Sequence, residues 1–144
     1  MTLTGSPQMD AERAFTRARR SRRRAAVARR LRRHSTGCGR LPVHAEEAIR
    51  PAGFSRGIRE VPLDAIHGTL EPSRATLFDD GFRPAPAARS RWQRVWLAEQ
   101  RGTVLPPVAL VPIGDGYAIR DGHHRVSVAA ARGARTIDAT IDAG

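Results

Sequence analysis

The sequence contains a single cysteine and no long apolar stretch. One cysteine excludes a disulfide framework and a cysteine-based zinc site, and it fits a reducing compartment. No segment approaches the ~20 consecutive apolar residues that a membrane-spanning helix needs. The N-terminus also lacks the apolar core of a signal peptide, so we expect no secretion and a cytoplasmic location.

Lysine is absent as well, so all 25 basic residues are arginine, and 14 carboxylates leave a net charge of +11. Residues 1–59 hold 15 arginines and four carboxylates, whereas residues 60–144 hold ten of each. The excess charge therefore lies entirely in the first part of the chain. This division predicts an arginine-rich helical arm and linker over residues 1–57 and a single folded domain over residues 58–144.

The arm is predicted to form a helix from about Ala11 to Arg33, capped by Asp10, because it is rich in alanine and arginine and lacks glycine and proline. Its apolar stripe is repeatedly interrupted by arginine, so we expect it to bury no deep face against a core. Clustered cations without an apolar face favour DNA binding. The predicted nucleic-acid-binding residues are Arg19, Arg20, Arg22, Arg23, Arg24, Arg29 and Arg30. The alternatives are an acidic membrane surface, or a solvated arm whose arginines follow genome composition.

The folded domain is predicted to be α/β (α+β), a small domain with a mixed sheet. Alternating apolar residues and turn signals divide it into a strand, a long loop, a helix, a hairpin, a helix and a strand. The expected ranges are an edge strand over 58–63, the loop over 64–87, a helix over 88–101, hairpin strands over 108–113 and 117–120, a helix over 123–132 and a strand over 136–141. Trp92 and Trp96 are expected in the core.

The sharpest motif is the run Asp121-Gly122-His123-His124-Arg125, at the point where a strand passes into a helix. The first turn of a helix presents unpaired backbone N–H groups and the positive end of the helix dipole, both of which attract anions. Gly122 permits close approach of a ligand, and Arg125 and the imidazoles add donors. Asp121 is expected to cap the helix or to help hold Mg²⁺. The turn predicts a phosphate site, and the alternative is an ordinary capping turn with solvated side chains.

From about Glu60 to Ile141 the chain resembles the ParB/sulfiredoxin superfamily. The residues that carry this resemblance are the segments 61–66 (VPLDAI), 105–108 (LPPV) and 117–133 (YAIRDGHHRVSVAAARG). It is most similar to small bacterial proteins with a stand-alone ParB N-terminal-like domain, often labelled ParB-like nuclease. The resemblance implies the fold of that superfamily and a nucleotide, CTP, ATP or ADP with Mg²⁺, at the motif.

The sequence departs from two branches of the superfamily. His123 stands where sulfiredoxin has its nucleophilic cysteine, and Cys38 lies far away in sequence, so we do not expect sulfiredoxin chemistry. ParB has a glutamate at the same position, which puts nucleotide hydrolysis in question. Because the chain ends at Gly144, we also expect none of the DNA-binding and dimerisation domains of a partition protein.

A third branch, the free-serine kinases, has a similar Asp-Gly-His-x-Arg turn and takes a general base from the segment after the first strand. This resemblance makes Glu71 the candidate base. Arg74 lies where ParB-type domains have a second arginine-bearing loop, so the resemblance to those domains makes it a second phosphate clamp. The hypotheses are therefore a nucleotide- or phosphate-binding module, a small-molecule kinase, or a nuclease. His34, His44 and His67 are scattered and no cluster of carboxylates is present, so we expect no metal site formed by the protein alone.

Overall fold

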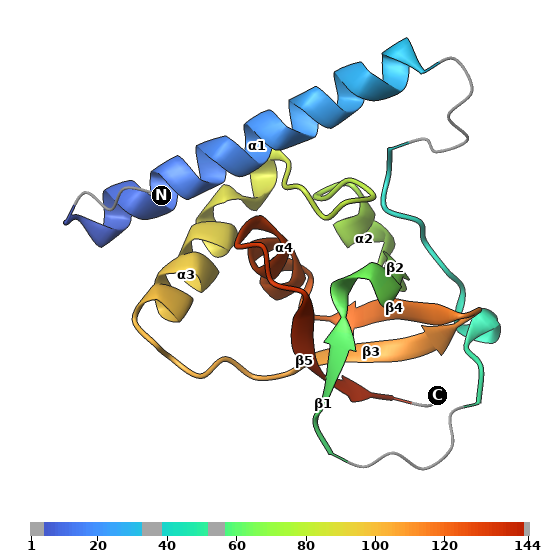
Figure 1. Cartoon of the computed structure of the whole chain (residues 1–144). Coiled ribbons are helices and arrows are strands. Elements are labelled where there is room, and N and C mark those ends of the chain that lie inside the picture. The colour runs from blue at the N-terminus through green and yellow to red at the C-terminus, as the bar shows by residue number, and fades with distance from the viewer. Residues whose placement is uncertain (1–4, 33–38, 52–56, 143–144) are drawn as a thin grey trace.

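The structure is a computed structural model that describes residues 5–32, 39–51 and 57–142. Helices and strands are mixed along this part of the chain, and Figure 1 shows the helices to one side of a twisted sheet. The strands are β1 (Arg59–Pro62), β2 (Ile66–Thr69), β3 (Val108–Ile113), β4 (Gly116–Asp121) and β5 (Thr136–Ile141). The helices are α1 (Pro7–Leu31), α2 (Pro72–Ala75), α3 (Arg89–Gln100) and α4 (His123–Ala131). Short 3-10 turns cover Glu46–Ala48, Leu63–Ala65 and Pro86–Ala88.

The five strands form one sheet in the order β1-β5-β3-β4-β2. β1 pairs antiparallel with β5, and β3 pairs antiparallel with β4, whereas the β3–β5 and β2–β4 pairs are parallel. β1 ends at Pro62 and lies at an edge, where a residue without an N–H group does not break the pairing. The predicted mixed sheet, the edge position of the first strand and the hairpin of β3 and β4 are confirmed.

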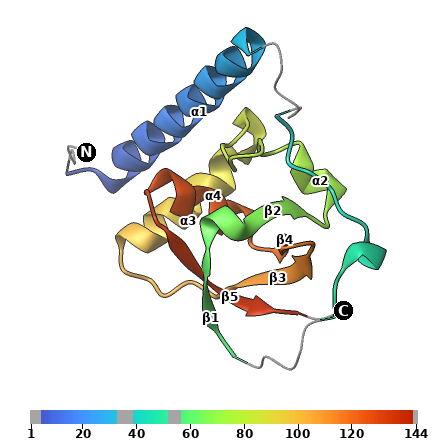
Figure 2. The same ribbon diagram turned by 45° about the vertical axis from the view of Figure 1, so that its right-hand side comes forward.

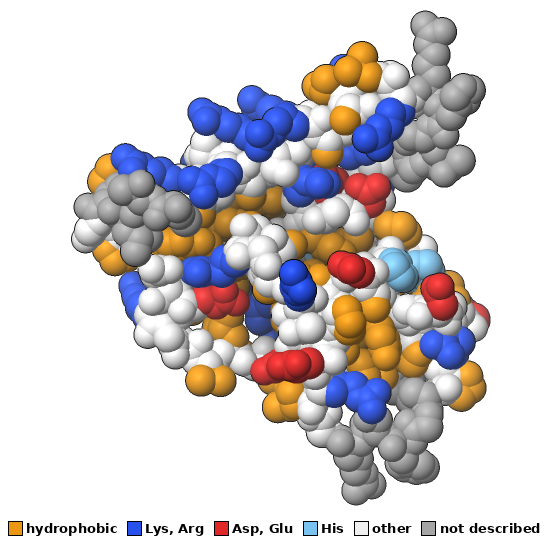
Figure 3. All heavy atoms as spheres, viewed as in Figure 1, with side chains coloured by type: hydrophobic (Ala, Val, Ile, Leu, Met, Phe, Trp, Pro, Cys, Tyr) orange, Lys and Arg blue, Asp and Glu red, His pale blue; other side chains and the backbone are white. Residues whose placement is uncertain are grey.

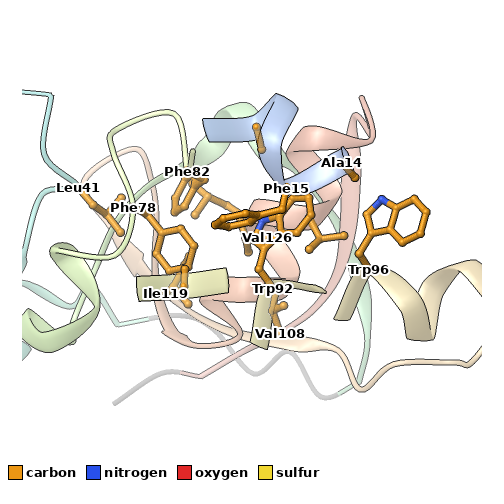
Figure 4. Packing of buried hydrophobic residues seen from close by; sticks show 14 of the residues in the cluster. Ala14, Phe15, Leu41, Phe78, Phe82, Trp92, Trp96, Val108, Ile119 and Val126 are labelled. Carbon is orange, nitrogen blue, oxygen red and sulfur yellow. The ribbon is translucent and has the colours of Figure 1, made fainter. Parts of the chain in front are cut away.

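The core lies between the sheet and the helices α3 and α4. Trp92 and Trp96 are buried, as expected, and the indole N–H of Trp92 donates to the hydroxyl of Ser127 at 2.9 Å. That hydroxyl in turn donates to the carbonyl of Phe82. Figure 4 shows the aromatic side chains of this cluster converging from different elements. The buried polar chain thus ties α3, α4 and the segment before α3 together.

The expectation that the arm buries no deep face is wrong, because the N-terminal half of α1 belongs to this core. Phe15 is fully buried and meets Trp92 edge-to-face, with ring centroids 5.5 Å apart. Three alanines on the same side of the helix, Ala11, Ala14 and Ala18, are also buried. Small side chains let α1 approach α3 closely. Figure 2 shows α1 as the outer helix, on the same side of the sheet as α3 and α4. The helix begins at Pro7, before the predicted start. The division of the chain at residue 57 stays a prediction.

The segment predicted as a long loop over residues 64–87 contains structure that the sequence did not reveal. β2 pairs in parallel with β4, about fifty residues further along the chain. After α2, the loop is closed by Asp79, whose carboxylate accepts the N–H groups of Gly81 and Arg83 at 3.0 and 2.8 Å. Asp79 is buried and lies 3.4 Å from the guanidinium of Arg83. This loop is therefore a rigid part of the domain.

The segment that precedes β1 is held to the sheet as well. The N–H of His44 donates to the carbonyl of Thr69, and the N–H of Thr69 donates to the carbonyl of Pro42, both at 2.9 Å. Leu41 is buried. Residues 40–44 thus run along the outer edge of β2. Residues 52–56, near the end of the predicted arm and linker, fall outside the described residues.

Candidate anion sites at the α4 turn and on α1

The motif of residues 121–125 lies where β4 passes into α4, as predicted. Gly122 is the N-cap residue, with φ of 110° and ψ of 25°, and no side chain caps the helix. The first helical hydrogen bond runs from the N–H of Val126 to the carbonyl of Gly122. The N–H groups of residues 123–125 therefore have no partner within the helix. A Cβ at position 122 would lie 2.5 Å from the side chain of Val108, so packing as well as the positive φ requires glycine here.

The two histidines are buried rather than displayed. His123 and His124 are 4% and 7% exposed, and Phe78 contacts both rings, stacked on the first and edge-to-face with the second. Nε2 of His123 lies 2.5 Å from the hydroxyl of Thr69 at the end of β2. These contacts fix both imidazoles against the core.

Burial also decides the charge of the two histidines. It lowers the pKa of His123 to about 4, with further contributions from the positive charges of Arg74 and His124, against an opposing effect of Asp121. Burial likewise lowers the pKa of His124 to about 4, assisted by Arg91 and Arg74. Both rings are neutral at pH 7. They do not supply the cationic donors that the sequence suggested.

The guanidinium of Arg125 lies beside Gly122 but is already bound to other groups of the protein. Its guanidinium donates to the carbonyl oxygens of Pro106 and Pro107 and lies 3.4 Å from the carboxylate of Asp121. This arginine therefore anchors the segment before β3 to α4. Its predicted role as a phosphate ligand would require that it give up these partners.

Two other arginines bring positive charge to the turn. Arg74, from α2, acts on both histidines, and Arg91, from the first turn of α3, acts on His124. Neither guanidinium has a carboxylate partner among residues 5–32, 39–51 and 57–142. Arg74 thus lies near the turn, as the prediction requires, and its role as a phosphate clamp stays a prediction. Sequence reasoning missed Arg91, although an arginine in the first turn of a helix opposes the helix dipole and was visible as an anomaly.

The two carboxylates of the predicted site, Asp121 and Glu71, lie at the starts of different helices, α4 and α2. The side chain of Asp121 is 82% exposed, directly precedes the N-cap and lies 3.4 Å from the guanidinium of Arg125, and its role as a Mg²⁺ ligand stays a prediction. Glu71 starts α2, and its N–H donates to the Thr69 hydroxyl at 2.9 Å, but its side chain is exposed and interacts electrostatically with Arg120. The role of Glu71 as a general base stays a prediction.

The outer side of α1 carries a second concentration of positive charge, which Figure 3 shows along the length of the helix. Five arginines line a shallow hollow on this side with Met9, Thr16 and a single carboxylate, Glu12. The five are Arg13, Arg17, Arg20, Arg23 and Arg24. We call them the α1 arginine face.

The predicted nucleic-acid residues divide into several groups. Arg20, Arg23 and Arg24 are exposed on the α1 arginine face, and Arg30 is exposed nearer the end of the helix. Arg19 and Arg22 are half-buried. Arg29 lies 3.8 Å from Asp79 and 4.0 Å from Asp80, so its charge is compensated within the protein. Arg13 and Arg17 were missed because the prediction concentrated on the densest run of arginines.

Two features of other classes of protein are absent from the described ranges. Within the described ranges, no three His, Cys, Asp or Glu side chains are grouped closely enough to hold a metal ion. Of the helices in those same ranges, none combines the length and apolar character needed to cross a bilayer.

No protein-family model and no curated protein matches the chain. Among solved structures, sulfiredoxin from Arabidopsis thaliana is similar, with a TM-score of 0.46 and 20% sequence identity, over 62% of this chain and 88% of that one. Sulfiredoxin is a branch of the superfamily that the sequence resembles. The likeness concerns the arrangement of the chain alone.

Proposed function

We propose that this protein binds the phosphate groups of a nucleotide at the N-terminal turn of α4, and that it associates with DNA through the α1 arginine face. The observation that carries the first part is a cluster of positive charge without a counterion. Arg74 and Arg91 flank a helix N-terminus whose amide groups are free, and they have no carboxylate partner in the described parts of the chain.

This cluster repels itself as long as it holds no anion. The N-terminus of a helix carries the equivalent of about half a positive charge, and Arg91 stands in the first turn of a second helix, α3. Burial keeps the adjacent histidines neutral, and the nearby guanidiniums lower their pKa values further. A phosphate group would accept the N–H groups of His123 and His124 and neutralise both arginines. A triphosphate or diphosphate with Mg²⁺ at Asp121 matches this charge better than a monoanion.

The chemistry that a nucleotide would supply is phosphoryl transfer, and the residues of this chain would bind and orient the phosphates. The neutral imidazoles pack between the turn and the core, and Arg74, from α2, would contact the phosphates. A kinase of the free-serine type is the alternative, with Glu71 as the base. Its distinguishing sign is serine-dependent release of nucleoside diphosphate, whereas a binding module leaves the nucleotide intact. A cytoplasmic location goes with this proposal because nucleotides and DNA are found together there.

Calorimetric titration with CTP, ATP and ADP, with and without Mg²⁺, tests the nucleotide site. We expect Arg74→Gln and Arg91→Gln each to weaken binding about 10-fold or more, because each removes a charge-assisted contact to phosphate. Arg101→Gln is the matched control, since it removes the same charge from the opposite end of α3. Wild-type protein that binds none of these nucleotides, or variants that bind as well as wild type, would contradict the proposal.

The second part of the proposal rests on the geometry of α1. Arg13, Arg17, Arg20 and Arg24 follow one another at four- and three-residue steps, which places them along one side of the helix. The span from Arg13 to Arg24 covers roughly 16 Å of helix, over which one DNA strand presents about five phosphates. No apolar stripe accompanies these arginines, which favours a phosphate backbone over a membrane surface.

A further inference from the structure

A separate cavity lies beside the buried half of α1, away from the α4 turn. It is enclosed by one side of α1, by residues 81–84 of the Asp79 loop and by the C-terminal ends of α3 and α4, and its volume is about 580 Å³. Four arginines line it, Arg17, Arg24, Arg83 and Arg132, and no carboxylate does. Cavities of this size hold ligands up to the dimensions of a nucleotide.

Two of the four arginines form a fixed wall. The guanidinium of Arg83 donates to the hydroxyl of Ser21 on α1 at 3.0 Å and lies 3.4 Å from the buried carboxylate of Asp79. The guanidinium of Arg132 stacks on Trp96, 4.7 Å from the ring centre, and lies 3.0 Å from Glu99. About a third of each side chain remains exposed, 36% and 31%. The Nη2 of Arg132 also donates to the carbonyl of Trp96 at 3.0 Å and to the side-chain oxygen of Gln100 at 3.2 Å. Both arginines are thus held in place, and Nη2 of Arg83 and Nη1 of Arg132 have no partner among the described residues.

The other two arginines supply charge that nothing in the described protein balances. Arg17 and Arg24 stand seven residues apart on α1, with Ser21 between them, so all three face the same side of the helix. Neither guanidinium lies within ion-pair distance of a carboxylate in the parts of the chain that the structure covers. A ligand with two negative charges would contact the guanidiniums of Arg17 and Arg24 on one side. On the other side it would contact those of Arg83 and Arg132, which the protein already orients.

We propose that this cavity is a second anion site, which binds a phosphate group between Arg17 and Arg24 on one side and Arg83 and Arg132 on the other. Guanidinium pairs favour phosphate because their planar N–H groups match its oxygens two at a time. The phosphate belongs either to a free phosphorylated molecule or to the backbone of a nucleic acid that already contacts the α1 arginine face. The cavity shares no residue with the α4 turn, so these two sites stand or fall separately, whereas it shares Arg17 and Arg24 with the α1 arginine face.

Titration of the ¹⁵N-labelled full chain, followed by NMR, tests this site. The probes are inorganic phosphate, adenosine 5′-monophosphate and a short DNA duplex. We expect the amide signals of Gly81, Arg83 and Ala131 to shift with saturation. Shifts with phosphate and the mononucleotide identify a free phosphorylated molecule as the ligand, and shifts with the duplex alone identify a backbone phosphate. The signals of residues 122–124 report the α4 turn in the same spectra, so failure of either site is seen independently.

The matched variants are Arg17→Gln/Arg24→Gln and Arg94→Gln/Arg135→Gln, which remove the same total charge. The first pair lines the cavity, and the second pair is exposed and lies outside its lining. We expect the first variant to weaken the binding that shifts the cavity signals at least 10-fold, and the second to leave it unchanged. Cavity signals that no probe moves, or that move equally in both variants, would overturn the proposal. The unliganded spectrum of each variant verifies that it is folded.

Discussion

The α4 turn and the α1 arginine face both concentrate positive charge, but they do so by different means. At the turn, the charged residues of the motif are already engaged: Arg125 is bound to backbone carbonyls and the histidines are buried and neutral. Attraction for an anion there depends on backbone N–H groups and on two arginines from other elements. On α1, the exposed arginines are part of one helix and face solvent directly. The proposed ligand of the turn is therefore a single small anion, and that of α1 is an extended polyanion.

The largest effect is expected where α1 joins the core, because this contact fixes the arginine face to the domain. Phe15→Ala removes a fully buried ring from its place against Trp92 and should lower the free energy of unfolding by about 3–5 kcal/mol. Chemical denaturation measures this loss. Val27→Ala, on the 55% exposed side chain further along α1, should change it by less than about 0.5 kcal/mol. Equal stabilities of the two variants would mean that α1 is a detached arm after all.

Salt dependence distinguishes the two regions next. Arg13→Gln/Arg20→Gln/Arg23→Gln removes three guanidiniums from the α1 arginine face. The plot of log K against log salt for duplex DNA should lose about 2–3 units of slope, and affinity at 0.1 M salt should fall roughly 10²- to 10³-fold. Fluorescence anisotropy at several salt concentrations gives both quantities. If the charge-matched Arg94→Gln/Arg101→Gln/Arg135→Gln variant lost as much, net charge rather than α1 would explain the binding.

The neutral histidines predict a fall in stability at mildly acidic pH. Their pKa values are about 4 in the folded protein and about 6.5 when unfolded, so the unfolded chain binds more protons between these values. Stability is complete above pH 6.5 and decreases as the pH falls towards 4. The loss should be about 2 kcal/mol for each histidine between pH 7 and pH 5. Urea denaturation at both pH values measures it, and His124→Gln should remove about half of the difference. A flat profile would show that the histidines are accessible and titrate normally.

The smallest effect is expected at the arginine of the motif itself. Arg125→Ala should weaken nucleotide binding less than about 3-fold in calorimetry, because its guanidinium is bound to Pro106 and Pro107. It should instead cost roughly 1–2 kcal/mol of stability through the lost hydrogen bonds. If nucleotide affinity fell more than about 10-fold while stability stayed unchanged, Arg125 would be a phosphate ligand, as Arg74 is proposed to be, and the account would be wrong.

The parts of the fold that were predicted correctly depend on local patterns. Gly114 and Gly116 mark the turn between β3 and β4, and α3 has two tryptophans at helical spacing. β2 escaped because it has four residues, includes Gly68, and gains its pairing only from β4, far along the chain. The buried face of α1 escaped because three of its residues are alanine, which contributes little apolar surface but permits close helix packing.

The sequence predicted where the candidate site lies, but not which side chains donate hydrogen bonds there. A strand-to-helix turn that contains Gly122 follows from the sequence, and so does the free helix N-terminus, whereas the left-handed conformation of Gly122 was not predicted. The direction of the Arg125 side chain does not, since it is set by carbonyls eighteen and nineteen residues earlier. The approach of Arg91 likewise depends on how α3 packs against α4. Side-chain partners across elements are what the sequence alone leaves undetermined.

The backbone N–H signals of His123 and His124 give the most direct test of the central claim, that a nucleotide phosphate binds the free turn of α4. We predict that titration with CTP or ATP in the presence of Mg²⁺ shifts both signals downfield, with a saturation curve that matches calorimetry. Arg74→Gln should weaken this response, and Arg101→Gln should not. Nucleotide that binds by calorimetry while these two signals stay in place would contradict the account.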